Sequence, residues 1–439
     1  MDDIFYSTFR QNLASGTLRT IGVDPKPQTA MSNHHLPPEM VDHTVDFLHD
    51  EPETLKQCCL VSKSWIPRTR KHLFASVKFF LKKDVASWKE TFPDPSDSPA
   101  HYADTLFISC PQAVTEADAK EGGWIRTFSR VVRLELGNRT GNSLGVSFAP
   151  FHNFSPALTS LRVEFLSFPC SSVFSLIRSF PLLNDITLFG CGDSPGDCDG
   201  PHRPQTVVPS TSPALTGSLE LTILVGMEYI ARPLLGLPNG LHFQKLAFSW
   251  LELEGPRWIM ELVLRCSHTL ECLDITYPSS MFALVLSWGC CLPSLVGGSD
   301  PAPIDLSKAK KLKDLIFRPG SGTVEWVIMA LQTIAPKHRD LRRITIHIPF
   351  HWSPASLYSN AWQTIGAPVR RRWLDLDRLL VQFRESRSIC PKIVCIAQAE
   401  GERNARVCVG YLLPEITEGG TSELVELTGT VDVAAVTYC

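Results

Sequence analysis

The chain has 439 residues, of which 44% are hydrophobic and 20% are charged, proportions typical of folded soluble proteins and not of disordered ones. Its 42 basic and 45 acidic side chains leave a formal charge of -3, so no global field draws it to nucleic acid or to an acidic membrane surface. No run of 18 or more uncharged apolar residues occurs, which excludes a predicted transmembrane helix. Other proteins are therefore the expected partners.

The first 33 residues are predicted to form a flexible leader. They combine a few hydrophobic side chains with a polar, proline-containing stretch at 24–29. They show neither the basic region nor the apolar region of a secretory signal, so we expect the chain to act in the cytoplasm, the nucleus or both. The 14 cysteines are scattered along the sequence, which indicates reduced thiols and not a disulfide framework.

Three short helices are predicted between residues 36 and 74. Residues 36–38 read Leu-Pro-Pro and should enter the first helix in an extended conformation. The reason is that a residue before proline avoids the helical region, while proline itself suits the first helical turn. Val41, Val45 and Leu48 then recur at i, i+4 and i+7, which draws one apolar stripe along a helix of about three turns.

The second and third helices are predicted from proline and serine positions. Pro52 opens the second helix, since proline is tolerated at the first helical position. The third helix is predicted to begin at Trp65, with Ser62 or Ser64 as its cap. The three helices together form the domain that we assign to residues 34–80.

This segment resembles an F-box. The resemblance rests on the LP opening, on the apolar spacing through Leu48 and Leu55, and on CLVSKSW at 59–65, and it covers about a tenth of the chain. F-box proteins use the three-helix unit to dock on the small adaptor subunit of a cullin-RING ubiquitin ligase. The resemblance therefore implies an adaptor-binding surface that is made or supported by Leu36, Pro37, Met40, Val45, Leu48, Leu55, Leu60, Val61 and Trp65.

The alternative is that these apolar residues form the core of a small helical subdomain. A unit of this length cannot bury all of them unaided, and surplus apolar surface on a small domain marks a partner site. Some of the residues are therefore expected in a core and the others in an interface.

Residues 81–127 are predicted to be a linker. They contain PDPSDSP at 93–99, and such proline- and aspartate-rich runs are typical of surface loops. A regular pattern begins only after this segment, at residue 128.

The pattern that runs from residue 128 to residue 398 combines short strands with helices. Eight short segments alternate apolar and polar residues with a period of two, as strands do. Helical i, i+3, i+4, i+7 spacing occurs between several of them, at 173–180, 259–266 and 324–331. The predicted buried strand positions are 25 to 33 residues apart except for one gap of 42, and they are Leu134, Leu161, Ile186, Leu219, Leu246, Leu273, Leu315 and Ile344.

This periodicity predicts a leucine-rich-repeat-like α/β solenoid, or horseshoe, for residues 128–398, because repeats of this kind stack to complete one core. The repeats are degenerate, since they lack a regular asparagine after the strand. A doubly wound α/β domain would also alternate strands with helices. Residues 373–394 and 411–427 resemble the closing segment of a large fungal class of F-box proteins with divergent repeats, so residues 399–439 are predicted to cap the core.

The predicted sheet also has an outward face, because alternation turns every second side chain away from the core. That face is polar and mixed in sign, which suits a transient, charge-complementary contact with a client protein. The alternative is that these residues are solvated strand positions. The candidate client-binding residues are Arg162, Glu164, Lys245, Asp274, Arg343 and His347.

Three patterns suggest chemistry but do not match the sites they resemble. Ser143 lies in a G-x-S-x-G sequence, but no strand runs directly into it as a nucleophile elbow requires. The insertion at 191–204 carries aspartates and cysteines without calcium-loop or zinc spacing. Zinc spacing is also missing in the group formed by Cys266, His268 and Cys272. We therefore expect no catalytic residue, no metal and no cofactor.

The predicted function is client recognition within a cullin-RING (SCF-type) ubiquitin ligase. The F-box would dock on the adaptor, and the repeat region would bind a client protein whose identity the sequence does not indicate. No enzymatic activity, nucleic-acid partner or membrane association is expected. The alternative is a non-catalytic repeat scaffold that is not linked to ubiquitination.

Overall fold

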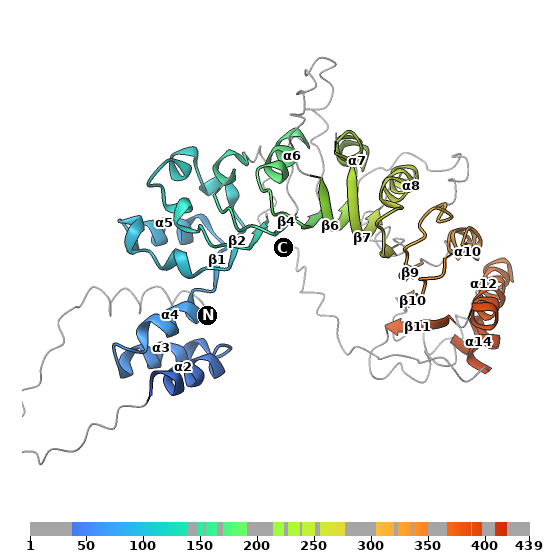
Figure 1. Cartoon of the computed structure of the whole chain (residues 1–439), viewed down its shortest axis with the longest axis horizontal. Coiled ribbons are helices and arrows are strands. Elements are labelled where there is room, and N and C mark those ends of the chain that lie inside the picture. The colour runs from blue at the N-terminus through green and yellow to red at the C-terminus, as the bar shows by residue number, and fades with distance from the viewer. Residues whose placement is uncertain are drawn as a thin grey trace, which may run out of the picture. The chain divides into compact units, whose positions relative to one another are not determined.

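The computed structural model (Figure 1) describes residues 37–137, 147–152, 154–164, 170–190, 214–223, 227–237, 239–250, 255–276, 304–319, 324–334, 338–349, 367–387, 389–396 and 409–418. The chain divides into two compact units, unit 1 with residues 1–142 and 146–161, and unit 2 with residues 143–145 and 162–439. The fold is α/β. Eleven parallel strands of the described residues form an open sheet in which they follow one another in sequence order, from β1 to β11.

Unit 1 begins with three helices, α2 (Pro38–Phe47), α3 (Pro52–Val61) and α4 (Ile66–Leu73). The helix starts predicted from the prolines are confirmed, because each helix has a proline at one of its first two positions. The serine cap predicted for the third helix is wrong. Ser62 and Ser64 share a hydrogen bond of 2.9 Å between their hydroxyls, and the residue at the cap position is Trp65, which makes no side-chain capping bond.

The linker predicted over residues 81–127 is instead folded. It contains α5 (Lys82–Thr91), β2 (Thr105–Ile108) and five short 3-10 turns, at Pro95–Asp97, Pro99–Tyr102, Pro111–Ala113, Glu116–Ala119 and Trp124–Thr127. The strands β1 (Ser76–Phe79) and β3 (Arg133–Leu136) flank this segment. A sixth 3-10 turn at Ala149–Phe151 and the strand β4 (Ser160–Glu164) follow β3. The boundary between the two units lies within β4.

An aromatic cluster explains why this segment is folded. Its ring centroids lie 4.9 to 6.4 Å apart, mostly in edge-to-face or tilted pairs, arrangements that aromatic quadrupoles favour. The members are Phe79, Trp88, Phe92, Trp124 and Phe128. These aromatics are spread over 50 residues without a helical or strand period, so the sequence pattern did not indicate a core there.

Unit 2 alternates strands with helices. The strands are β5 (Asp185–Phe189), β6 (Leu215–Ile223), β7 (Leu241–Trp250), β8 (Cys272–Thr276), β9 (Asp314–Arg318), β10 (Arg343–Pro349) and β11 (Cys390–Ile396). The helices are α6 (Cys170–Arg178), α7 (Met227–Leu235), α8 (Gly255–Cys266), α10 (Val324–Gln332), α12 (Ala367–Arg387) and α14 (Pro414–Glu418). Figure 1 shows the labelled helices of this unit on one side of its strands. Neighbours such as α7 and α8, or α10 and α12, contact each other.

The strand register confirms the predicted buried positions. All eight of them are fully or almost fully buried. In unit 2 they oppose one another on adjacent strands, in the order Ile186, Leu219, Leu246, Leu273, Leu315 and Ile344. In unit 1 the same kind of row contains Val77, Leu106 and Leu134. The core of each unit is therefore a ladder of aliphatic side chains on one sheet face.

The strand order excludes the doubly wound alternative. In a doubly wound sheet the order reverses at a switch point, where the ligand crevice forms. Here the order runs from β1 to β11 without reversal. The described part of the sheet therefore lacks the crevice where doubly wound proteins bind their ligands.

The segment predicted to cap the core is described over residues 409–418. There α14 contacts α12, and the buried carboxylate of Asp377 on α12 accepts hydrogen bonds from the backbone N–H groups of Glu415 at 2.7 Å and Ile416 at 3.0 Å. Asp377 thus caps the first turn of α14 from another helix, where N–H groups have no partner within the helix itself.

Candidate functional site

The three-helix segment has a small core of its own. Val41, Val45 and Leu55 are buried together, and Leu48, Trp65 and Leu73 pack against them half-buried. Four of the predicted adaptor-binding residues, Val45, Leu48, Leu55 and Trp65, therefore hold the helices together and can support an interface without making its surface. Val45 lies on α2 and Leu55 on α3, and both of these helices contact α4.

A polar contact joins the first helix to the third. The Asp46 carboxylate accepts hydrogen bonds from Arg68 Nε at 2.6 Å and from Arg68 Nη2, and it lies 2.7 Å from His72 Nε2. The hydrogen bond from Arg68, followed by that from His72, holds the pKa of Asp46 well below its usual range. Sequence reasoning missed this contact, because Arg68 and His72 follow Asp46 by 22 and 26 residues. Neither distance belongs to a helical or strand period.

Large hydrophobic side chains remain exposed on α2 and at the end of α3. Met40 is 54% exposed, Phe47 82%, Leu60 72% and Val61 66%. Among the predicted adaptor-binding residues, Pro37 is exposed as well, and Leu36 lies outside the described residues. Exposed hydrophobic side chains on a unit that already has a core mark a surface for a partner.

Phe47 is the residue of this surface that sequence reasoning missed. It follows Met40 by seven residues on α2, so the two side chains lie on the same side of the helix. This second apolar stripe runs beside the buried stripe of Val41 and Val45. A search for two apolar stripes on one short helix would have found it, whereas a search for a single core stripe did not.

The six predicted client-binding residues lie on β4, β7, β8 and β10 of unit 2. Arg162, Lys245 and Arg343 are exposed, whereas Glu164, Asp274 and His347 are half-buried. The described helices of this unit lie on the other side of the strands (Figure 1). The side-chain alternation predicted from the sequence is therefore confirmed for these positions.

Several charges on this face are paired within the protein. Arg162 pairs with Glu164, Arg318 with Asp274 at 2.8 Å, and Arg343 with Asp314 at 3.0 Å. The last two pairs are cross-strand, since each joins neighbouring positions of adjacent strands. One large apolar residue interrupts this polar row, because Ile316 lies between Asp274 and Thr345 in the register.

Two of the half-buried residues carry polar atoms that lack a partner. Within the described structure, Asp274 Oδ1 and His347 Nδ1 are buried and make no hydrogen bond. Burial raises the pKa of Asp274, against the opposing effect of Arg318. Burial also lowers the pKa of His347 to about 4, with further contributions from Arg318 and Lys392. The imidazole is therefore neutral at pH 7, and the hydrogen-bonding capacity of both buried atoms is unused in the described structure.

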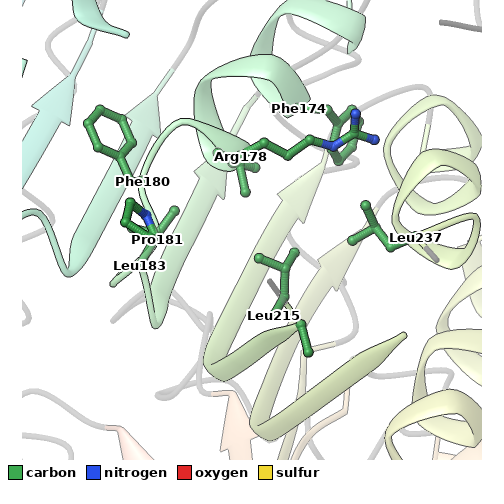
Figure 2. Close-up of a pocket in the computed structure, with 9 residues that line it drawn as sticks. Phe174, Arg178, Phe180, Pro181, Leu183, Leu215 and Leu237 are labelled. Carbon is green, nitrogen blue, oxygen red and sulfur yellow. The ribbon is translucent and has the colours of Figure 1, made fainter. Parts of the chain in front are cut away.

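A pocket in unit 2 is too small for a ligand. Figure 2 shows Arg178 reaching across a pocket that is otherwise lined by apolar side chains, among them Phe174, Leu215 and Leu237. Its volume is about 10 Å³, which is room for no more than about one water molecule. Arg178 Nε is buried there without a hydrogen-bond partner, and burial lowers the pKa of its guanidinium.

Of the three remaining motifs, the group formed by Cys266, His268 and Cys272 is the one that lies within the described residues. Ser143 and the insertion at 191–204 lie outside the described residues. Burial raises the pKa of the Cys266 thiol to about 11, so this sulfur stays protonated and is a poor metal ligand. No group of three or more His, Cys, Asp or Glu residues that could hold a metal occurs in the described part, and no described helix is long and apolar enough to span a bilayer.

Comparison with models of known protein families finds no match for this chain, and comparison with curated proteins finds no related sequence. The F-box resemblance therefore rests on the residues of the three-helix segment and of the closing segment. Any function that it implies for the chain is a proposal.

Proposed function

We propose that the three-helix segment docks on the adaptor subunit of a cullin-RING ubiquitin ligase, and that the chain is a substrate-recognition subunit of that ligase. The observation that carries the docking is the exposure of Met40, Phe47, Leu60 and Val61, 54 to 82% each, beside an intact small core. Interfaces are built around such apolar anchors, and a few of them supply most of the binding energy. The identity of the partner follows from the F-box resemblance.

The rest of the chain then serves to hold a client. Support for a leucine-rich-repeat-like solenoid comes from the sequential parallel strand order, the ladder of buried aliphatic residues, and the contacts between successive helices. In this proposal the chain has no active site of its own. It contributes proximity, because it holds the client where other subunits transfer ubiquitin. Action in the cytoplasm or nucleus is part of the same proposal.

The client is proposed to bind the strand face of unit 2 that the described helices leave uncovered. The half-buried polar side chains of Asp274 and His347 favour a client segment with polar groups, since an apolar segment would remove water from them without replacing its hydrogen bonds. The exposed cation Lys245 adds positive charge to this face, so acidic groups of the client should accompany those polar groups.

The test of the docking is a titration of the full chain with purified adaptor subunit, followed by calorimetry. The double substitution Phe47→Ala and Leu60→Ala should weaken binding at least tenfold, which corresponds to about 1.4 kcal/mol. The thermal midpoint should stay unchanged, because both side chains are exposed. Leu264→Ala on α8 is the matched control, since Leu264 is also an exposed hydrophobic residue, at 43%, and lies in unit 2.

An unchanged dissociation constant in the double variant would contradict the proposed surface. If the full chain does not bind the adaptor at all but still captures proteins through unit 2, the scaffold alternative replaces the ligase proposal.

A further inference from the structure

Two histidines of unit 2 meet at the start of β7. His242 Nδ1 lies 2.7 Å from His268 Nε2, and the ring centroids are 4.9 Å apart with the ring planes at 87°. His242 is the second residue of β7, and His268 lies in the turn after α8. The sequence suggested Cys266 and Cys272 as neighbours of His268, but its structural partner is 26 residues away in the preceding strand.

The backbone orients His242 toward His268. The second ring nitrogen of His242, Nε2, lies 3.2 Å from the carbonyl oxygen of Asn239. A carbonyl only accepts hydrogen bonds, so Nε2 carries the proton and the lone pair of Nδ1 faces His268. Gly240 between them has a φ of 73°, a left-handed conformation that favours glycine and lets the chain turn so that the carbonyl reaches the ring.

The turn that carries His268 is bonded to β7 as well. Thr269 donates from its hydroxyl to the carbonyl of Phe243 at 3.0 Å, and the Glu271 N–H donates to the carbonyl of Gln244 at 2.7 Å. Both acceptors follow His242 directly along β7. The two imidazoles are therefore positioned by backbone on both sides before any ligand arrives.

We propose that His242 and His268 bind a divalent transition-metal ion, Cu²⁺ or Ni²⁺ in preference to Zn²⁺, with water completing the coordination. Metal-bound histidines usually donate the second ring N–H to a carbonyl or carboxylate, and the Asn239 carbonyl occupies that position for His242. Imidazole is a good ligand for all three ions, and Cu²⁺ is generally bound most tightly.

The spacing of the two nitrogens favours a right-angled geometry. An ion with metal–nitrogen bonds of about 2.0 to 2.1 Å sets two ligands about 3 Å apart when the angle is a right angle, as in square-planar sites, and about 3.3 Å apart when it is tetrahedral. The observed separation of 2.7 Å between the two nitrogens has to increase less to reach the right-angled value than to reach the tetrahedral value. A tilt of the exposed His268 ring supplies this increase. No group of three or more His, Cys, Asp or Glu side chains that could hold a metal occurs in the described part of the chain, so the pair lacks the further ligands that complete a tetrahedral zinc site.

The test uses the full chain, freed of metal with a chelator and dialysed, then titrated separately with Cu²⁺, Ni²⁺ and Zn²⁺ in a calorimeter. We expect one saturable Cu²⁺ site per chain, with two nitrogen ligands in the electron paramagnetic resonance spectrum and a rise of the thermal midpoint on binding. His242→Gln and His268→Gln should each weaken Cu²⁺ binding at least tenfold. His101→Gln is the control, because His101 is exposed in unit 1 and bonded only locally, to the Ser98 carbonyl at 2.9 Å.

Three results would overturn the proposal. The first is the absence of saturable Cu²⁺ binding in the wild-type chain. The second is an unchanged affinity in both histidine variants when their metal-free thermal midpoints match that of the wild type. The third is tighter binding of Zn²⁺ than of Cu²⁺ and Ni²⁺, which would refute the right-angled geometry.

Discussion

Asp46 connects the buried and the exposed parts of the three-helix segment. It precedes Phe47, the most exposed of the four apolar side chains, and its carboxylate bonds Arg68 and His72 on α4. The orientation of α2, and with it the position of Met40 and Phe47, therefore depends on one half-exposed ionic contact as well as on the apolar core.

Replacing Asp46 by Asn should destabilise the folded chain by about 1 kcal/mol at neutral pH, a small effect because solvent screens a half-exposed pair. The pKa of Asp46 is lower in the folded state than in the unfolded state. Its ionised form therefore contributes stability above about pH 4, and this contribution is lost as the pH falls through the lower folded value. Thermal unfolding followed by circular dichroism between pH 7 and the acid range measures both effects.

The quantity to compare is the difference in thermal midpoint between the wild-type chain and Asp46→Asn at each pH. The wild-type chain should lose its advantage over the variant as the pH falls below about 4. A constant difference between the two midpoints over the whole range would mean that the carboxylate charge is irrelevant to the fold.

Among the elements, α14 depends most on a distant residue. It is five residues long, too short to be stable alone, and two of its N–H groups are satisfied by Asp377 from α12. Burial raises the pKa of Asp377, and the hydrogen bonds from Glu415 and Ile416 oppose that shift. The buried carboxylate thus holds the closing segment against the last long helix.

The substitution Asp377→Ala should loosen α14 from α12, with a local loss of about 1 to 3 kcal/mol for the unsatisfied N–H groups. Hydrogen exchange at the amides of Glu415 and Ile416 reports this directly, and both should exchange faster. Asp375→Ala on the same helix is the control, because Asp375 is exposed and pairs only with side chains such as Arg378, at 3.3 Å. Equal protection in both variants would show that the cap does not matter.

The proposal that unit 1 binds the adaptor and unit 2 binds the client can be tested by charge-reversing substitutions in unit 2. Unit 1 presents apolar side chains, whereas the helix-free face of unit 2 presents paired and unpaired charges. Reversal of Asp274 would leave Arg318 without its partner in a half-buried site, so it would damage the fold and reveal little about binding. The exposed cation Lys245 is a better probe, because its reversal breaks none of the ion pairs described above.

Lys245→Glu should strongly weaken the capture of client proteins by the full chain and leave adaptor binding unchanged. Arg265→Glu on α8 is the control, because this exposed arginine lies among the helices. Quantitative mass spectrometry of proteins retained from lysate at low and high salt gives the measurement. Recovery of the same proteins by Lys245→Glu would move the client site to another surface.

Local sequence patterns were enough to locate the strands β3 to β10 and most of the helices, whereas β1 and β2 were missed. Period-two alternation and i, i+3, i+4, i+7 spacing act over a few residues, so each of the eight predicted strand centres, such as Leu134 and Ile344, is buried in the structure. Prolines marked the helix starts for the same reason, since their effect acts within one turn. The exposed positions Met40, Leu60 and Val61 belonged to the predicted set, but the sequence did not separate them from core residues such as Val45.

Which side chains meet depended on the packing of these elements. The pairs Asp46 with Arg68, His242 with His268 and Asp274 with Arg318 are separated by 22, 26 and 44 residues. The aromatic cluster likewise joins β1 to turns in the segment predicted to be a linker. Such contacts require strands and helices to lie side by side, and no local period encodes that placement. Sequence patterns therefore located the elements, and their packing selected the exposed apolar surface, the paired charges and the histidine pair.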